Sequence, residues 1–296
     1  MVTLTLPVNV TSVVAVPRSL RVAAGLEDGH VAIWSPNEGA TSLLLRPHTA
    51  RVLALGTSAD GTELVSVAGD GTIARTPITP GATPVSVTVD LGPAPPRAAA
   101  CSAEGSRIVI GGEKGELRVF DSRTGGRTAP ARAHRAELMA LAFQPGSSVV
   151  ASASAEADLC LWDAASGREI RRLDCGLSLW ALVFSPDGTL AAGGVARRLT
   201  LYGAKVFEPT THTTLEAPNM IASLAWSADG RLVAIGHVDS DTLGKGGVRV
   251  VDASTRAVVT TIDTGGSPTF KLAFGGADSV VGAFGRELRA WSFTRG

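Results

Sequence analysis

The chain has 296 residues, of which 45% are hydrophobic and 18% are charged, and its 27 basic side chains balance 27 acidic ones. A protein whose main ligand is nucleic acid needs an excess of Lys and Arg to neutralise phosphates, so this balance argues against direct nucleic-acid binding. No apolar run approaches the roughly 18 residues that cross a bilayer, so we expect no membrane association.

The first segment, residues 2–6, has the pattern of a β-strand. Val2, Leu4 and Leu6 alternate with two threonines, and such alternation is typical of a strand with one buried face. No basic region precedes these apolar residues, so we expect no signal peptide.

The cysteines favour a reducing compartment. There are three, Cys101, Cys160 and Cys175, without C-x-x-C spacing, which argues against a disulfide framework and against a cysteine zinc site. We therefore expect a cytoplasmic protein.

Arginine outnumbers lysine by 23 to 4. This bias is associated with GC-rich genes, and it favours a bacterial source.

A turn sequence recurs along the rest of the chain, most clearly as Ser185-Pro-Asp-Gly188. Five copies end at Gly61, Gly105, Gly146, Gly188 and Gly230, at intervals of 44, 41, 42 and 42 residues. Looser copies near Pro17 and Gly276 bring the number to seven. Proline presets φ, aspartate bonds its own backbone and glycine supplies a positive φ, so this pattern predicts a hairpin turn.

A second landmark has the same period. An apolar strand ends at Trp34, Thr76, Phe120, Trp162, Tyr202, Val251 and Trp291, at intervals of 42, 44, 42, 40, 49 and 40 residues. Each period holds about four short strands and no helical run, which is typical of a propeller blade. We predict an all-β fold, a single seven-bladed β-propeller domain of four-stranded antiparallel blades over residues 1–296.

The fourth repeat resembles the WD-repeat β-propeller family most closely. It contains His134, Leu138-x-x-Leu141-x-Phe143, Ser152 and the pair Trp162-Asp163. The resemblance implies a buried hydrogen-bonded set of His134, Ser152, Glu156 and Trp162, with Glu where the family usually has Asp. The second repeat keeps His48, Ser66 and Asp70 but has Thr76 in place of Trp.

The last repeat ends after its third strand, at residues 291–295. We therefore expect residues 2–6 to supply its fourth strand, because this closes the ring and removes an exposed sheet edge.

Motifs for catalysis are missing from the sequence. The five histidines show no metal-binding spacing, and neither a nucleophile elbow nor a phosphate-binding loop is present. Aligned on their first strands, the repeats place seven residues around the upper mouth of the channel: Ser12, Leu53, Arg97, Met139, Trp180, Ala222 and Phe270. None is a carboxylate or an imidazole, so we expect no metal, no cofactor and no enzyme activity.

Two aromatic residues of this ring are not explained by the repeat. Trp180 and Phe270 match no core position of the blades, and large aromatics are favoured as interface anchors. The alternative is that both fill space between blades.

The sixth repeat carries six extra residues. The interval from Ile235 to Val251 is 16 residues, against 10 from Ser152 to Trp162. The insertion falls in the loop 237–247, on the face where the family often binds partners, and its His237, Asp239 and Asp241 alternate as cation ligands do. A solvated hairpin tip is favoured over a cation site, because three ligands without a fourth bind weakly.

The sequence thus favours a non-enzymatic scaffold that binds a protein or peptide in a multiprotein assembly. The predicted partner-binding residues are Trp180, Phe270, Met139, Arg97, His237, Asp239 and Asp241. One alternative is an enzymatic or small-molecule-binding propeller with a site in the channel. Another is a regulatory subunit of a nucleic-acid machine that uses an arginine-rich sector: Arg118, Arg123, Arg127, Arg132 and Arg135.

Overall fold

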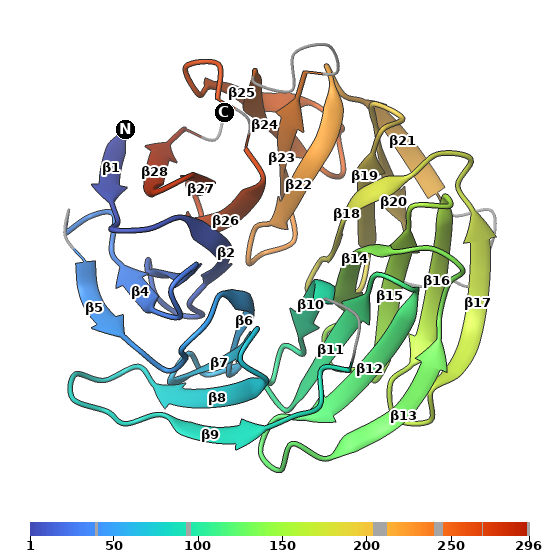
Figure 1. The fold of residues 1–296 in the computed structure, drawn as a ribbon. Coiled ribbons are helices and arrows are strands. Elements are labelled where there is room, and N and C mark those ends of the chain that lie inside the picture. The colour runs from blue at the N-terminus through green and yellow to red at the C-terminus, as the bar shows by residue number, and fades with distance from the viewer. Residues whose placement is uncertain (39–40, 93–95, 204–211, 240–244, 268, 295–296) are drawn as a thin grey trace.

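The computed structural model describes residues 1–38, 41–92, 96–203, 212–239, 245–267 and 269–294. In these residues all regular elements are β-strands, and they form seven four-stranded antiparallel sheets. Figure 1 shows the sheets arranged as blades around a central axis, each with its first strand innermost. The predicted fold class is confirmed.

The blades follow one another along the chain. Blade one is β2 (Val10–Ala15), β3 (Val22–Leu26), β4 (Val31–Trp34) and β5 (Thr41–Leu45), and blade two is β6 (Val52–Thr57), β7 (Glu63–Ala68), β8 (Thr72–Pro77) and β9 (Val85–Thr88). Blade three is β10 (Pro96–Cys101), β11 (Arg107–Gly112), β12 (Glu116–Asp121) and β13 (Arg127–Arg132), and blade four is β14 (Leu138–Phe143), β15 (Val149–Ser154), β16 (Asp158–Asp163) and β17 (Arg168–Asp174).

Three further blades complete the ring. Blade five is β18 (Leu179–Phe184), β19 (Leu190–Gly194), β20 (Arg198–Tyr202) and β21 (His212–Glu216), and blade six is β22 (Met220–Trp226), β23 (Leu232–Val238), β24 (Gly246–Asp252) and β25 (Val258–Asp263). Blade seven is β26 (Lys271–Gly276), β27 (Ser279–Phe284) and β28 (Glu287–Ser292), with β1 (Val2–Thr5) as its outer strand.

The recurring turns have the predicted hairpin geometry. The five turn glycines all have positive φ: 73° at Gly61, 68° at Gly105, 66° at Gly146, 87° at Gly188 and 70° at Gly230. In the turn after β18, Asp187 Oδ1 accepts a hydrogen bond from Thr189 N at 3.0 Å, and Gly188 N donates to the carbonyl of Ser185 at 3.0 Å. The side-chain acceptor and the glycine conformation together reverse the chain within four residues.

The N-terminal strand closes the ring, as predicted. β1 pairs antiparallel with β28, with Leu4 opposite Leu288, and Leu6 N donates to the carbonyl of Arg286 at 2.8 Å. Leu4 and Leu6 pack into a cluster that also contains Val22 of blade one. β1, at the blue N-terminal end, therefore lies beside the red strand β28 in Figure 1.

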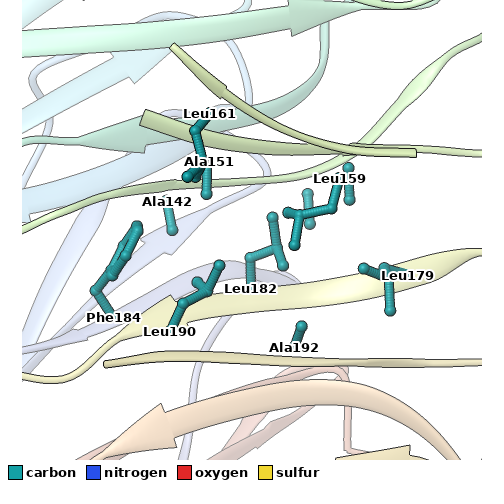
Figure 2. Packing of buried hydrophobic residues seen from close by; sticks show 11 residues of the cluster. Ala142, Ala151, Leu159, Leu161, Leu179, Leu182, Phe184, Leu190 and Ala192 are labelled. Carbon is teal, nitrogen blue, oxygen red and sulfur yellow. The ribbon is translucent and has the colours of Figure 1, made fainter. Parts of the chain in front are cut away.

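The core lies between neighbouring blades. Figure 2 shows the cluster between blades four and five, where Ala142 and Ala151 oppose the larger Leu182 and Phe184. Each sheet is thus buried on both faces, so its strands carry near-continuous apolar residues. This packing accounts for the low charged fraction of the sequence.

Two blades hold a strained turn between their second and third strands. Blades one to three have Gly29, Gly71 and Gly115 there, with φ of 90°, 79° and 77°, whereas blades four and five have Ala157 at 68° and Arg197 at 54°. A Cβ in this left-handed region costs about 1 kcal/mol or more.

Ala157→Gly should therefore stabilise the protein by about 1 kcal/mol and raise Tm by about 2 °C, because glycine adopts this conformation freely. Calorimetry measures the shift. Ala155→Gly is the matched control, since Ala155 has no positive φ, and it should lower Tm. An equal response to both substitutions would contradict the strain at Ala157.

Candidate partner-binding site

Bulges at the start of the innermost strands create the mouth of the channel. In blade four the register with β15 steps from Leu138 to Ala140, so Met139 is an extra residue without a partner. The registers of blades two, three, five and six shift in the same way, and they leave four residues without a cross-strand partner: Leu53, Arg97, Trp180 and Ala222. A bulge re-aims its side chain, so these residues face the channel, although Leu53 also packs against the core cluster of blades two and three.

The ring residues surround one cavity on the axis. All seven predicted positions line a space of about 280 Å³: Ser12, Leu53, Arg97, Met139, Trp180, Ala222 and Phe270. Phe270 is 51% exposed, while Trp180 and Met139 are partly buried. The structure therefore brings four of the predicted partner-binding residues, Trp180, Phe270, Met139 and Arg97, to one opening.

In blade one the predicted ring position is displaced by one residue. The register passes from Val10 to Ser12, which makes Thr11 the bulged residue. Thr11 is buried, and its Oγ1 donates to the carbonyl of Val52 in the next blade at 2.6 Å. Thr11 therefore joins blades one and two, and Ser12 lines the cavity at the following position.

Arg97 is exposed but has two acidic partners. Its guanidinium lies 3.1 Å from Glu113 and 3.2 Å from Glu137, which belong to blade three and to the connection into blade four. The rim around Arg97 thus carries no surplus positive charge. We interpret Arg97 as a residue that holds the rim in place, and its predicted contact with a partner stays a prediction.

The inserted loop is shorter than predicted. β23 continues to Val238 and β24 begins at Gly246, so His237 lies inside a strand and only 9% of it is exposed. It pairs with Gly247, which leaves room for the ring because glycine has no side chain. The placement of His237 in an exposed loop is therefore wrong. Asp239 N donates to the carbonyl of Lys245 at 2.8 Å, and Asp241 lies outside the described residues.

The buried set of blade four has the predicted bonds at three of its residues. His134 Nε2 lies 2.7 Å from Ser152 Oγ, and Trp162 Nε1 donates to the same oxygen at 2.9 Å. The other ring nitrogen, Nδ1, lies 4.0 Å from Cys160 Sγ, and the acid on its side is Asp158 at 3.9 Å, whereas the predicted Glu156 is exposed. The assignment of Glu156 is wrong.

The second blade explains the exchange. There Asp70, at the position of Glu156, accepts a 2.7 Å hydrogen bond from Thr49 N and lies 3.6 Å from His48. Thr72, at the position of Asp158, touches His48 Nδ1 at 2.8 Å. In blade two, His48 thus has polar neighbours at both turn positions, Asp70 and Thr72. In blade four the carboxylate near His134 comes from the later position, that of Asp158.

The arginine-rich sector is smaller than predicted. Arg118 is buried and lies 3.2 Å from Glu116, whereas Arg123, Arg127 and Arg135 are exposed.

Within the described part of the chain, no group of three or more His, Cys, Asp or Glu side chains could hold a metal ion. Nor does any helix there have the length and hydrophobicity needed to cross a membrane.

Sequence reasoning missed Lys271, which lines the channel directly after Phe270. The signal was present, because the aligned position in blades two to six is always Ala or Ser.

Seven four-stranded sheets around a channel with an aromatic rim define a β-propeller. Residues 128–163, which form most of blade four, match the family model described as "WD domain, G-beta repeat". The match covers about one repeat, and together with the seven-bladed fold it supports a WD-repeat β-propeller.

The chain is also similar to parts of larger proteins. It is 26% identical over 126 residues to "Telomerase protein component 1" of Mus musculus, which covers 42% of this chain and 5% of that protein. It is 27% identical over 184 residues to "Periodic tryptophan protein 2" of Arabidopsis thaliana, with 61% and 20% covered. The Dictyostelium discoideum homolog is 29% identical over 176 residues, with 55% and 18% covered. The chain spans a fifth or less of these curated relatives.

Proposed function

We propose that this protein is a non-enzymatic scaffold that binds a protein or peptide partner at the mouth of its channel, as a subunit or adaptor of a multiprotein assembly. The observation that carries the proposal is the cavity at the axis, bordered by Phe270, which is half exposed, and by Trp180. One relative is named as a protein component of telomerase, which is in keeping with such a role.

The rigidity of the ring supports binding by a small number of contacts. All seven blades are complete four-stranded sheets, and the N-terminal strand joins the last blade to the first. A preorganised surface loses little conformational entropy on binding, so two aromatic anchors contribute a large share of the affinity.

The chemistry around the channel supports a non-enzymatic role. The cavity is lined by Ala, Val, Leu, Ser, Met and aromatic residues together with Arg97 and Lys271, and no carboxylate or imidazole is among them. Burial raises the pKa of the Cys160 thiol to about 12, so this cysteine is protonated and a poor nucleophile at neutral pH.

We also propose a cytoplasmic location, in keeping with the three free cysteines. The relatives named above are eukaryotic, so the bacterial source inferred from the arginine bias stays a prediction.

Trp180→Ala and Phe270→Ala should each weaken partner binding at least tenfold, because a hot-spot aromatic contributes about 2 kcal/mol or more. The partner is obtained by affinity purification from the native host and mass spectrometry, and its affinity for the purified variants is measured by calorimetry.

Val85→Ala is the matched control, because Val85 is 68% exposed on an outer strand far from the channel. All three variants should keep the circular dichroism spectrum of the intact protein. Unchanged affinity in both aromatic variants would contradict binding at the channel mouth.

A further inference from the structure

The second layer of the channel holds one residue that the packing does not require. In blades one to six the position after the bulge is occupied by Ser12, Ala54, Ala98, Ala140, Ala181 and Ser223. Lys271, the first residue of β26, takes the corresponding place in blade seven. Small side chains let the blades approach each other near the axis. A lysine at this position gives the fold no such benefit, so its presence needs another explanation.

The ammonium group of Lys271 has no acidic partner. The side chain lines the cavity, and no ion pair joins it to a carboxylate among the described residues. Two glutamates of the rim, Glu113 and Glu137, are already paired with Arg97. Lys271 therefore brings an uncompensated positive charge to the cavity.

The surroundings make this charge unfavourable in the empty protein. Solvent reaches Lys271 through the cavity, yet the innermost strands surround it, and this desolvation together with the charge of Arg51 lowers the pKa of its amine. An anion in the cavity would offset both effects. Since the walls are apolar, the attraction between the ammonium group and an anion is stronger than in open solvent.

We infer that the channel contains a subsite for a carboxylate of a bound peptide, with Lys271 as the counter-charge and Phe270 and Trp180 as apolar walls above it. This deepens the proposed function, on which it rests, by naming the chemistry of the partner: an acidic group beside an apolar residue. The carboxylate is either an Asp or Glu side chain or the C-terminus of the partner chain.

The donor set favours a carboxylate over a phosphate. A phosphate group carries about two negative charges and three strong acceptor oxygens, and it is best bound by several donors such as arginine forks. Lys271 is a single cation, and Arg97, the one arginine lining this cavity, is paired with glutamates. One ammonium group matches one carboxylate.

Three immobilised peptide libraries with randomised flanking residues test the subsite. The first has a central Glu and blocked ends, the second has Gln in its place, and the third is blocked at the N-terminus only and has no acidic side chain. We expect the intact protein to bind the first or the third at least tenfold more tightly than the second, since a desolvated charge pair contributes about 1.5 kcal/mol or more. The preferred library shows whether the carboxylate is a side chain or a C-terminus.

Four variants separate the subsite from the proposed function. Lys271→Met should abolish the preference for the carboxylate, and Lys271→Arg should retain it. Lys114→Met removes an exposed lysine from the turn between β11 and β12 and should behave as the intact protein does. Trp180→Ala should weaken binding to all three libraries.

The outcomes distinguish the two proposals. Equal binding of the Glu, Gln and free-C-terminus libraries, a preference that survives in Lys271→Met, or no binding of any library overturns the carboxylate subsite. If the Gln library binds as tightly as the others but depends on Trp180, the scaffold function stands without the subsite. If the preference depends on Lys271 while Trp180→Ala has no effect, the subsite stands and the aromatic anchor is wrong.

Discussion

A chain that lacks residues 1–7 should unfold at a temperature at least about 5 °C below that of the intact chain. The deletion removes β1 from the outer edge of blade seven and takes Leu4 and Leu6 out of the cluster that joins blades seven and one. The buried Leu6 contributes about 2 kcal/mol and the half-buried Leu4 contributes less, and the hydrogen bonds between β1 and β28 are lost with them. Differential scanning calorimetry measures the change.

Point substitutions show that burial causes this loss. Leu6 is 5% exposed and should cost about 2–5 kcal/mol when it is changed to alanine, because a cavity forms between two blades. Val2 is 40% exposed on the same segment, so Val2→Ala should leave Tm almost unchanged.

The deletion also uncovers β28. Its outer edge would present unpaired backbone groups, which favours pairing with the same edge of a second molecule. We expect the shortened chain to form dimers or larger species in size-exclusion chromatography, while the intact chain and Leu6→Ala elute alike. A monomeric deletion variant with unchanged Tm would contradict closure by β1.

The fold could be predicted because each blade repeats the same local chemistry. A turn such as Ser185-Pro-Asp-Gly188 specifies its own geometry, and Gly188 adopts the required positive φ of 87°. Two landmarks with one period then fix the number of blades. The closing strand followed from counting, since the last repeat contained three strands and residues 2–6 were unassigned.

The site was less accessible to this reasoning because its details depend on register. A bulge is not visible in a sequence, so counting aligned Ser12 with the bulged residues of the other blades, whereas the bulged residue of blade one is Thr11 and Ser12 lines the cavity at the next position. Strand ends depend on cross-strand partners, and Gly247 allows β23 to extend through His237. Likewise Asp158 and Glu156 are two residues apart, and their positions relative to His134 depend on the turn between β15 and β16.

Lys271 shows what a comparison of repeats detects when every position is used. Its neighbours in the other six blades are small, and a lysine among them stands out without any structure. What the sequence alone does not contain is that this position faces the channel, because the alternation of inward and outward residues shifts at the bulge.

The buried set of blade four makes the stability of the protein depend on pH. Trp162 Nε1 donates to Ser152 Oγ, and the serine hydroxyl has two acceptors within reach, His134 Nε2 at 2.7 Å and the carbonyl of Cys160 at 3.5 Å. We assign its hydrogen to His134, the closer of the two. The ring then carries its hydrogen on Nδ1, on the side of Asp158. This chain of bonds requires a neutral imidazole.

Burial is the main reason that His134 stays neutral. Its side chain has no exposed surface, and desolvation, reinforced by the charge of Arg172, lowers its pKa to about 4 despite Asp158. The pKa values of His48 and His237 are also lowered by burial. In the unfolded chain the same imidazoles titrate near pH 6.5.

The free energy of unfolding should therefore fall as the pH is lowered from about 6.5 to about 4, by about 3 kcal/mol for His134 alone. Between these values the unfolded state binds a proton that the native state does not, so acid favours unfolding. Above pH 6.5 the imidazole of His134 is neutral in both the native and the unfolded state. Below pH 4 it is protonated in both states, and the loss of stability is complete. Urea unfolding at a series of pH values measures the slope.

His134→Gln isolates this contribution. Glutamine keeps an amide within reach of Ser152 but does not titrate, so the variant should be less stable than the intact protein at pH 7 and should lose less stability on acidification. His30→Gln is the control, because His30 is outside the buried set and about a quarter of its side chain is exposed. If His134→Gln shows the same pH slope as the intact protein, then His134 is already protonated in the folded state, and the hydroxyl of Ser152 does not donate to its ring.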